Sequence, residues 1–299
     1  MDRIVLFLNG TRGIAVAKAL LGADHGITAA VVLRECRGAE ACRAHGLDVI
    51  AVPDVNDPDF VRRVAALAPH LLVIAGFPQI FLGPLRSIAR HGAINLHAGR
   101  VPAYRGGSPL NWQIINGETS AGISILAVDE GIDSGDVLAE REIPIGPMDT
   151  IADLHRRADT AFPPMVLRVV KALEHGKIER RKQDPARAVY WHQRAPDDGR
   201  IFWDRATARQ VHDLVRALAP TYPGAFCYWG PRRVTILAAT VPEGVIRGTP
   251  GRVCHIQRRG PYVVCADRAL LLGTFEVEGA AQARLPTGVH LTPWPGAAA

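Results

Sequence analysis

The sequence predicts an α/β protein with an open, mostly parallel sheet and flanking helices, followed by a small C-terminal β-barrel. Two patterns support this prediction. In the first half of the chain, short apolar runs alternate with amphipathic stretches, which is typical of parallel strands joined by helical crossovers. Beyond Gly224, short runs of β-type composition alternate with Gly and Pro turns. The 299 residues, 48% hydrophobic and 21% charged, suffice to bury a sizeable core in one or two domains.

Each element of the first half follows from its apolar pattern. Buried strands are expected at residues 4–8, 27–33, 48–52, 71–75 and 93–96. Helices are expected at residues 13–21, 39–45 and 57–67, the last capped by Asn56 or Asp57. This alternation is Rossmann-like, and ligands of open α/β sheets bind beyond the carboxyl ends of the strands. The loop after the strand at 93–96 is therefore the expected place of a functional site.

The second half is expected to complete the sheet and then to form another domain. Two further strands are expected at residues 122–128 and 137–143, and helices at 150–175 and 206–218. Four β-type runs follow at residues 234–238, 251–256, 262–266 and 270–277. We therefore expect a Rossmann-like domain over residues 1–190, a connector over 191–205 and an OB-like open β-barrel domain over 206–299.

Cysteine content and hydropathy indicate a cytoplasmic protein. The five cysteines are scattered and show no C-x2-C spacing, which argues against a disulfide framework or a zinc site. We expect ordinary buried thiols at Cys36, Cys42, Cys227, Cys254 and Cys265. No apolar run approaches the roughly 20 residues of a membrane helix, and the apolar stretch near the N-terminus is too short for a secretory signal.

The net charge of +6 is unevenly distributed. From Arg200 onward there are 12 Lys and Arg against 6 Asp and Glu, whereas residues 1–175 hold 17 against 19. The excess of basic residues in the C-terminal part has two interpretations that composition leaves open. It could attract an anionic partner, such as a nucleic acid or a nucleotide-linked small molecule, or it could be a solvated surface rich in arginine.

Residues 94–110 form a Pro- and Gly-punctuated loop that contains a local pair of polar side chains. At the end of a strand, alternation places Asn95 and His97 on the same side. Histidine can move a proton near neutral pH, and an asparagine amide can donate to a developing oxyanion. Acidic candidates lie in residues 129–136, and a strand at 122–128 parallel to that at 93–96 would bring this loop alongside the pair. Taken alone, His97 could equally be a structural histidine bonded to the backbone.

Several motifs surround this pair in a fixed order. N-x-H at Asn95 and His97 is followed by P-x-x-R-G at 102–106, SPLNW and NGE at 108–112 and 116–118, and GIDSGD at 131–136. With this order and spacing, the sequence resembles the formyltransferases that use 10-formyltetrahydrofolate, the family of methionyl-tRNA formyltransferase and of amino-sugar formyltransferases. The resemblance covers nearly the whole chain, from near Arg3 to near Val277. Two departures are Arg100 in the loop at 97–102, where the family often has Gly, Ser and two Leu, and Phe202, where an acidic residue is common.

The resemblance implies a catalytic set of Asn95, His97 and Asp133. In these roles, Asn95 and His97 stabilise the oxyanion that forms when an amine attacks the formyl carbon, and His97 moves the amine proton. Asp133 keeps the imidazole oriented. Groups of this kind typically contribute roughly 100-fold or more in rate.

The resemblance also implies a folate site, with 10-formyltetrahydrofolate as co-substrate. The residues expected to bind it are Phe77, Pro78, Ile80, Leu82, Gly99, Arg100, Val101, Pro102, Asp129, Glu130, Gly131 and Ile132. We expect no metal, because the acidic loop at 129–136 has Ser134 where the EF-hand template requires glycine. Residues 10–13 fit neither the dinucleotide nor the P-loop fingerprint.

The expected acceptor is a small amine. The R-x-P-D-D-G form at 194–199 and the SPLNW and NGE segments resemble the branch of the family that formylates nucleotide-linked amino sugars, or otherwise hydroxyornithine. The alternative is methionyl-tRNA formyltransferase, which the basic C-terminal part favours, so tRNA remains a candidate partner. A further alternative is a 10-formyltetrahydrofolate hydrolase, in which water replaces the amine. No membrane partner is expected, and a homodimer is compatible with the sequence.

Overall fold

The protein is described by a computed structural model that covers residues 1–33, 37–256 and 259–296. Its chain forms two compact units. The first comprises Met1–Pro109, Ala121–Ile143 and His155–His192, and the second comprises Leu110–Ser120, Pro144–Leu154 and Gln193–Ala299. Two short segments that precede residue 155 therefore belong to the same unit as the C-terminal region.

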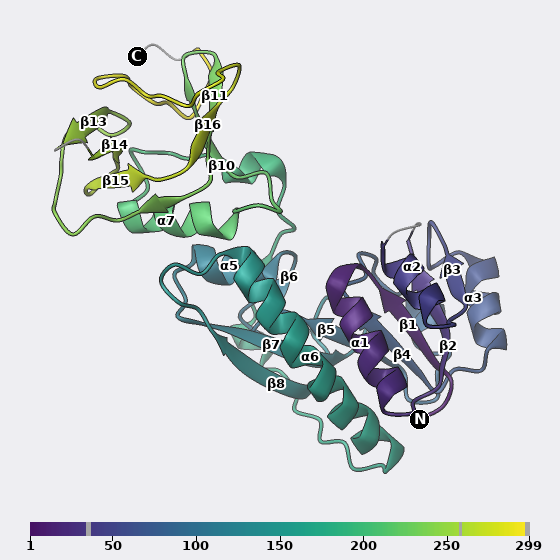
Figure 1. Cartoon of the computed structure of the whole chain (residues 1–299). Helices are drawn as coiled ribbons and strands as arrows, with labels where there is room; N and C mark the ends of the chain where they lie inside the picture. The colour runs from purple at the N-terminus through teal and green to yellow at the C-terminus, as the bar shows by residue number, and fades with distance from the viewer. Residues whose placement is uncertain (34–36, 257–258, 297–299) are drawn as a thin grey trace. The chain divides into compact units, whose positions relative to one another are not determined.

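The first unit is built on a seven-stranded sheet in the order β3-β2-β1-β4-β5-β7-β8 (Figure 1). In this order, the strands are Val49–Ala51, Ile27–Val32, Ile4–Leu8, Leu71–Ala75, Ala93–His97, Ser120–Ala127 and Val137–Pro144. The first five strands pair in parallel. All residues of β1 and β4 are buried, as expected of apolar strands covered on both faces. The predicted fold, a mostly parallel sheet with flanking helices followed by antiparallel strands, is confirmed.

Helices cover this sheet. They are α1 (Gly10–Gly22), α2 (Arg37–Ala44), α3 (Pro58–Ala66), α4 (Gly83–Arg86) and α6 (Ile151–Glu174). Helix α3 begins where predicted, because the Asp57 carboxylate accepts hydrogen bonds from the backbone of Asp59 and Phe60. Helices α1 and α6 lie side by side in Figure 1, and Arg12 on α1 is 3.1 Å from the Asp159 carboxylate on α6.

The direction of β7 differs from the prediction. Strand β7 is antiparallel to β5, with Ile94 opposite Ala127 and His97 opposite Ser124. A parallel neighbour requires a crossover that returns the chain to the edge where β5 began. Instead, residues 98–119 form a loop, the short strand β6 (Arg105–Gly106) and helix α5 (Pro109–Ile115). The chain therefore re-enters the sheet at the edge where β5 ended. Strand β6 pairs with β9 (Tyr190–Trp191), two further elements that the apolar pattern did not indicate.

The second unit contains helix α7 (Ala208–Ala217) and two antiparallel sheets. The three-stranded sheet has the order β10-β11-β16, with strands Ala225–Trp229, Arg232–Ile236 and Phe275–Val277. The four-stranded sheet has the order β12-β15-β14-β13, with strands Ala239–Thr240, Ala269–Leu272, Arg259–Val264 and Val253–Ile256. Trp203 is only 2% exposed in the core of this unit.

The prediction of one strand at 270–277 is wrong. The chain forms β15 and β16, which belong to different sheets. Between them, the backbone N–H groups of Gly273 and Thr274 both donate to the Ala238 carbonyl, at 2.8 and 3.3 Å. This local turn passes the chain from one sheet to the other, and the apolar pattern on either side of it gives no sign of the break.

Burial explains the state of most of the thiols. Cys42, Cys227 and Cys265 are buried, while Cys254 is partly exposed and Cys36 lies outside the described residues. Burial raises the pKa of the Cys227 and Cys265 thiols to about 12, so both remain protonated and unreactive at neutral pH. Within the part of the chain that the structure describes, no helix is long and apolar enough to span a bilayer.

Candidate active site

Asn95, His97 and Asp133 converge in the first unit. The Asn95 amide donates from Nδ2 to Asp133 Oδ1 at 3.1 Å, and His97 Nδ1 lies 3.4 Å from Asp133 Oδ2. Asn95 and His97 share one side of β5, as strand alternation predicts. The His97 side chain is 5% exposed and that of Asp133 is 12% exposed. The imidazole is therefore shielded from water, and the carboxylate lies closer to the surface.

The tautomer of His97 is determined by a backbone group. His97 Nε2 lies 2.6 Å from the carbonyl oxygen of Tyr104, in a buried contact. Because a carbonyl oxygen can only accept, Nε2 carries the hydrogen. In the neutral ring, Nδ1 is then the basic nitrogen, and it is the nitrogen that faces Asp133. Sequence reasoning assigned the orientation of the ring to Asp133 alone and missed Tyr104, because a backbone acceptor leaves no signal in residue type.

Gly99 leaves room for this hydrogen bond. A Cβ at position 99 would lie 2.4 Å from His97 Nε2 and 2.4 Å from the Tyr104 oxygen. The carbonyl of Gly99 accepts a buried hydrogen bond from Ser124 Oγ at 3.0 Å, which ties the loop to β7. Gly99 was predicted to contact folate, and its position beside the imidazole gives it a steric role as well.

The loop that carries Asp133 reaches the site by turning back on itself. Because β7 is antiparallel to β5, Ala127 ends beside the start of β5. The turn is closed by a 2.9 Å hydrogen bond from Ala127 N to Asp136 O. A Cβ at Gly135 would lie 1.9 Å from the Ala127 oxygen, so only glycine fits this close approach. Asp133 Oδ2 also accepts from the Gly106 backbone N–H at 2.9 Å, which links the turn to the P-x-x-R-G motif.

The predicted folate segment at 77–82 divides into buried and exposed side chains. Phe77 is buried in the core, edge-on to Phe7 with ring centroids 5.7 Å apart. Pro78 is exposed, and Ile80 and Leu82 are 61% and 56% exposed. Asn56 holds the backbone here, donating to the Ile80 oxygen and accepting from Leu82 N, both at 2.9 Å. The apolar side chains of Ile80 and Leu82 are thus presented to solvent by a fixed backbone.

The segment at 129–132 is joined to the same region by Arg86 of α4. Arg86 Nη1 donates to the Asp129 oxygen at 2.5 Å, and its Nη2 lies 3.9 Å from Glu130 Oε1. Gly131 is exposed, and Ile132 is 48% exposed. Sequence reasoning missed Arg86, although a basic residue between two candidate folate segments was available as a signal.

Residues 100–102 are largely engaged in contacts within the protein. Arg100 forms a 3.2 Å ion pair with Glu142 on β8. Val101 is buried in a small cluster with Leu126 and Val137. Pro102 is partly buried, and its carbonyl accepts from Val189 N at 2.9 Å. Direct contact between the Arg100 guanidinium and a ligand would therefore compete with the Glu142 pair.

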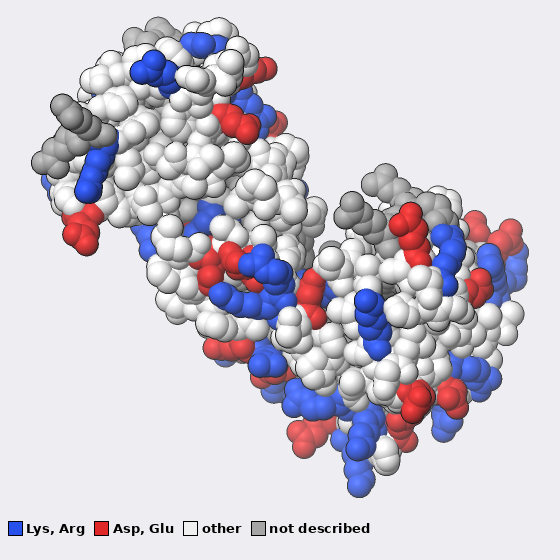
Figure 2. All heavy atoms as spheres, in the orientation of Figure 1, with Lys and Arg blue, Asp and Glu red and all other residues white. Residues whose placement is uncertain are grey.

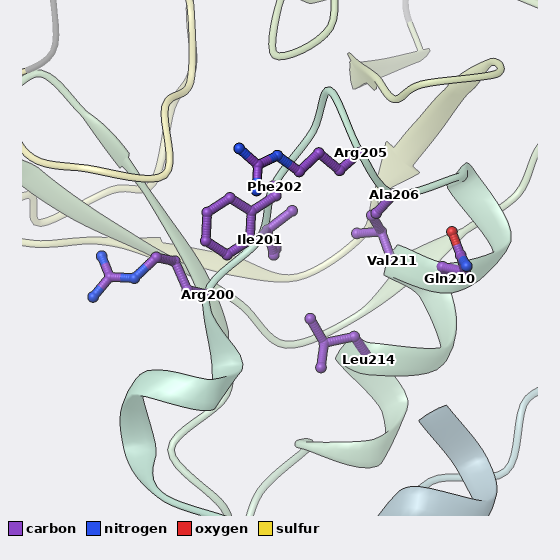
Figure 3. Close-up of a pocket in the computed structure, with 8 residues that line it drawn as sticks. All are labelled: Arg200, Ile201, Phe202, Arg205, Ala206, Gln210, Val211 and Leu214. Atoms are coloured by element: carbon purple, nitrogen blue, oxygen red, sulfur yellow. The ribbon is translucent and has the colours of Figure 1, made fainter. Parts of the chain in front are cut away.

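A shallow pocket of about 260 Å³ lies in the second unit and is lined by none of the predicted site residues (Figure 3). Its side chains come from the connector and from α7 and include Phe202. The Arg200 guanidinium at its edge stacks 4.0 Å from the Trp294 ring and donates to the Pro293 oxygen at 2.8 Å. These contacts hold the C-terminal segment in place and bring no acid–base pair together. Within residues 1–33, 37–256 and 259–296, no group of three His, Cys, Asp or Glu side chains is placed to hold a metal ion.

Comparison with known proteins identifies the family. The family described as formyl transferase matches residues 25–170, and the one described as formyl transferase, C-terminal domain, matches residues 194–286. The chain is 35% identical over 247 residues to methionyl-tRNA formyltransferase of Geobacter sulfurreducens, covering 83% of this chain and 76% of that protein. The chain belongs to the formyltransferase family. It is therefore an enzyme that transfers formyl groups.

Two solved structures share the fold of this formyltransferase at low sequence identity. Methionyl-tRNA formyltransferase from Clostridium thermocellum is 20% identical with a TM-score of 0.60, over 82% of this chain and 95% of that one. An N-formyltransferase from Helicobacter canadensis, in complex with folinic acid and dTDP-3-aminofucose, is 14% identical with a TM-score of 0.67, over 92% of this chain and 100% of that one.

Proposed function

We propose that this formyltransferase moves the formyl group of 10-formyltetrahydrofolate to the amine of a small acceptor. The observation that carries the proposal is the convergence of Asn95, His97 and Asp133, with an amide donor and a basic imidazole nitrogen on the same carboxylate. The first two side chains come from one strand end and the third from a tightly closed turn. This arrangement suits a reaction in which charge develops on a carbonyl oxygen while an amine loses a proton.

Asn95 acts as a hydrogen-bond donor to the formyl oxygen. Its amide nitrogen has two hydrogens, and one of them is bonded to Asp133 Oδ1. Among the described residues no second partner of Asn95 Nδ2 is found, so the other hydrogen is free to stabilise the charge on the formyl oxygen. The Asp133 bond fixes the amide plane in advance, which avoids reorganisation during the reaction.

His97 accepts the proton that the amine loses. Its Nε2–H is bonded to the Tyr104 carbonyl, so the ring cannot flip without losing a buried hydrogen bond. Nδ1 then receives the proton, and the Asp133 carboxylate at 3.4 Å stabilises the imidazolium that results. Asp133 thus acts on both members of the pair.

The folate supplies the formyl group, and the first unit offers residues that fit its flat ring. Ile80, Leu82 and Ile132 expose apolar side chains on two backbone segments that Arg86 joins. Exposed apolar patches often mark ligand-binding grooves. We assign the folate to these segments, with Gly99 to Pro102 as the side adjoining His97. The folinic acid in the Helicobacter canadensis N-formyltransferase supports a folate ligand for this fold.

The proposed acceptor is a small amine, with a nucleotide-linked amino sugar first and hydroxyornithine second. Several arginines of the second unit support this choice, because their guanidinium groups are engaged in contacts within the unit. Arg209 and Arg216 pair with Asp213, Arg233 stacks on Phe226, and Arg268 binds carbonyls of the 242–244 segment. Over β10 to β16, the face drawn in Figure 2 shows single basic side chains separated by uncharged ones. A tRNA bound on this face would meet isolated basic side chains and not a continuous basic surface.

A second candidate is formylation of methionyl-tRNA. It is favoured by the curated relatives, since methionyl-tRNA formyltransferases match at 31% to 35% identity. In that case, the basic residues of the second unit would neutralise RNA phosphates. Hydrolysis of 10-formyltetrahydrofolate, with water as acceptor, is the third candidate.

A tetrahydrofolate-release assay distinguishes the three. The full chain is mixed with 10-formyltetrahydrofolate and one acceptor at a time: nucleotide-linked amino sugars, hydroxyornithine, charged initiator methionyl-tRNA, or none. Turnover with a small amine that is insensitive to salt supports the proposal. Turnover only with tRNA, falling steeply with salt through counterion release, replaces it by the second candidate. Equal turnover without acceptor replaces it by the hydrolase.

A further inference from the structure

The turn at Asp133 requires outside support. Asp133 has φ +50°, in the left-handed region that costs a residue with a Cβ about 1–2 kcal/mol. Its carboxylate must nevertheless stay within hydrogen-bond reach of Asn95 and close to His97. Hydrogen bonds to the turn from elsewhere in the chain would hold this strained backbone in place.

Gln183 supplies two such bonds from 50 residues further along the chain. Its side-chain Nε2 donates to the Asp133 carbonyl at 2.8 Å and to the Gly135 carbonyl at 2.7 Å. Both hydrogens of the amide are therefore used to bridge the two sides of Ser134. Gln183 lies outside every motif noted in the sequence, in a stretch of mainly charged residues.

Arg105 orients the Gln183 amide. Its Nε and Nη2 donate to Gln183 Oε1 at 3.0 and 2.9 Å, and its Nη1 donates to the Tyr190 hydroxyl at 2.8 Å. The Arg105 residue is 4% exposed, so its guanidinium is held away from water. With Oε1 accepting this fork, the amide cannot flip, and its NH2 group must face the turn.

These contacts close a ring through the backbone. Arg105 precedes Gly106, whose N–H donates to Asp133 Oδ2 at 2.9 Å. The path therefore runs from the Asp133 carbonyl through Gln183 and Arg105 to Gly106 and back to the Asp133 carboxylate. The backbone and the side chain of Asp133 are both fixed by one connected network, in which each bond restrains the next.

We propose that Gln183 is a positioning residue for Asp133, oriented by Arg105. The residue touches neither substrate in this role and acts by keeping the carboxylate against Asn95 and His97. The inference rests on the proposed function for its kinetic consequence. Its structural consequence, the fixed carboxylate, is independent of the reaction.

Two substitutions test the role. Gln183→Glu retains an acceptor for Arg105 but places a carboxylate oxygen against the carbonyl oxygens of Asp133 and Gly135. Gln183→Met keeps a side chain of similar length and removes all of its hydrogen bonds. Both should lower kcat by about 10- to 100-fold, because displacement of a reacting group by about 1 Å costs up to 100-fold. The change in KM for each substrate should be smaller than the loss in kcat, since the Asp133 carboxylate is displaced directly and the proposed folate segment at 129–132 only through the same turn. Lys182→Ala, at the exposed neighbouring residue, should match the wild type. A kcat within about twofold of wild type in both variants, or a loss confined to KM, overturns the proposal.

Amide hydrogen exchange at Gly106 provides a readout that needs no activity. The Gly106 N–H is bonded to the Asp133 carboxylate, so a loosened turn should expose it and accelerate its exchange in both Gln183 variants relative to Lys182→Ala. Unchanged protection overturns the proposal even where kcat falls. If the wild type transfers no formyl group to any acceptor while exchange still accelerates, the proposed function fails and the positioning of Asp133 by Gln183 stands.

Discussion

The two units each contain a histidine beside an aspartate, and the two pairs have opposite surroundings. In the first unit, His97 Nδ1 is 3.4 Å from Asp133, and in the second, His212 Nδ1 is 3.3 Å from Asp213. Asp133 accepts from an amide and a backbone N–H on a turn near the surface. Asp213 is 2% exposed and is held by two arginines, Arg209 and Arg216. A carboxylate that is neutralised by guanidinium groups stabilises a fold, whereas one without them remains able to stabilise a proton on its neighbour.

Asp133→Asn is expected to have the largest effect on activity. The substitution keeps the size of the side chain and removes the charge that stabilises the His97 imidazolium in the proposed mechanism, so kcat should fall by about 100- to 10,000-fold. The melting temperature should fall less than in Asp213→Asn, because asparagine keeps one oxygen acceptor for the Asn95 amide or the Gly106 N–H and no buried guanidinium loses its partner. Steady-state formyl transfer and thermal unfolding measure the two quantities. Glu179→Gln, at an exposed acidic residue, serves as the control and should retain full activity; a kcat above about one tenth of wild type in Asp133→Asn would contradict the assigned role.

Asp213→Asn is expected to show the reverse pattern. Removing one partner leaves the Arg216 guanidinium, whose side chain is 5% exposed, without its carboxylate. Breaking a buried pair in this way costs about 3–5 kcal/mol of unfolding free energy. The kcat of the folded fraction should remain close to wild type. Denaturant unfolding of the full chain checks the first expectation. A loss of unfolding free energy below about 1 kcal/mol would mean that the pair of Asp213 and Arg216 contributes little to stability.

Gly99→Ala should have a smaller effect than the loss of Asp133. The new Cβ would push the imidazole and the Tyr104 carbonyl apart, which breaks the bond that fixes the tautomer of His97. We expect kcat to fall by about 10- to 100-fold, in line with the cost of a displacement near 1 Å. Gly22→Ala at the end of α1 is the matched control, because a Cβ there meets no atom within 4 Å. Equal rates for the two variants would show that the Tyr104 bond is dispensable.

The sequence predicts contacts in the site well when the two residues are close in the chain, and poorly when they are far apart in the chain. Asn95 and His97 are two residues apart on one strand, so alternation alone places them together. Asp133 was assigned through the order of motifs, and its proximity was expected from a parallel strand that is in fact antiparallel. A tight turn nevertheless brings Asp133 back to the pair, and this turn depends on the close approach of Gly135 to the Ala127 carbonyl. Tyr104 acts through its backbone and Gln183 through contacts 50 residues away, so neither leaves a local pattern.

The strands show the same dependence on distance along the chain. Strands β1 and β4 are uninterrupted apolar runs and could be located from composition, because burial on both faces selects such residues. Strands β6 and β9 are two residues each and exist only because the chain returns at Tyr190 to pair with Arg105. Pairing of this kind depends on the tertiary structure, and the positions of Arg105 and Gln183 depend on it in turn.

The pH dependence of stability tests whether the charge of Asp213 stabilises the fold. Burial alone raises the pKa of Asp213, but the hydrogen bonds from His212 and Arg216 and the charges of Arg216 and Arg209 together outweigh it and hold the pKa below its ordinary value of 3.8. A carboxyl whose pKa is lowered by folding adds stability above its ordinary pKa and loses it as the pH falls through the folded value. The difference in unfolding free energy between wild type and Asp213→Asn should therefore be constant near neutral pH and shrink below about pH 4. Denaturant unfolding of both proteins at pH 7, 4 and 3 measures it, and taking the difference cancels the acid sensitivity of the rest of the chain. A difference that stays constant to pH 3 would mean that Asp213 contributes to packing and hydrogen bonding without its charge.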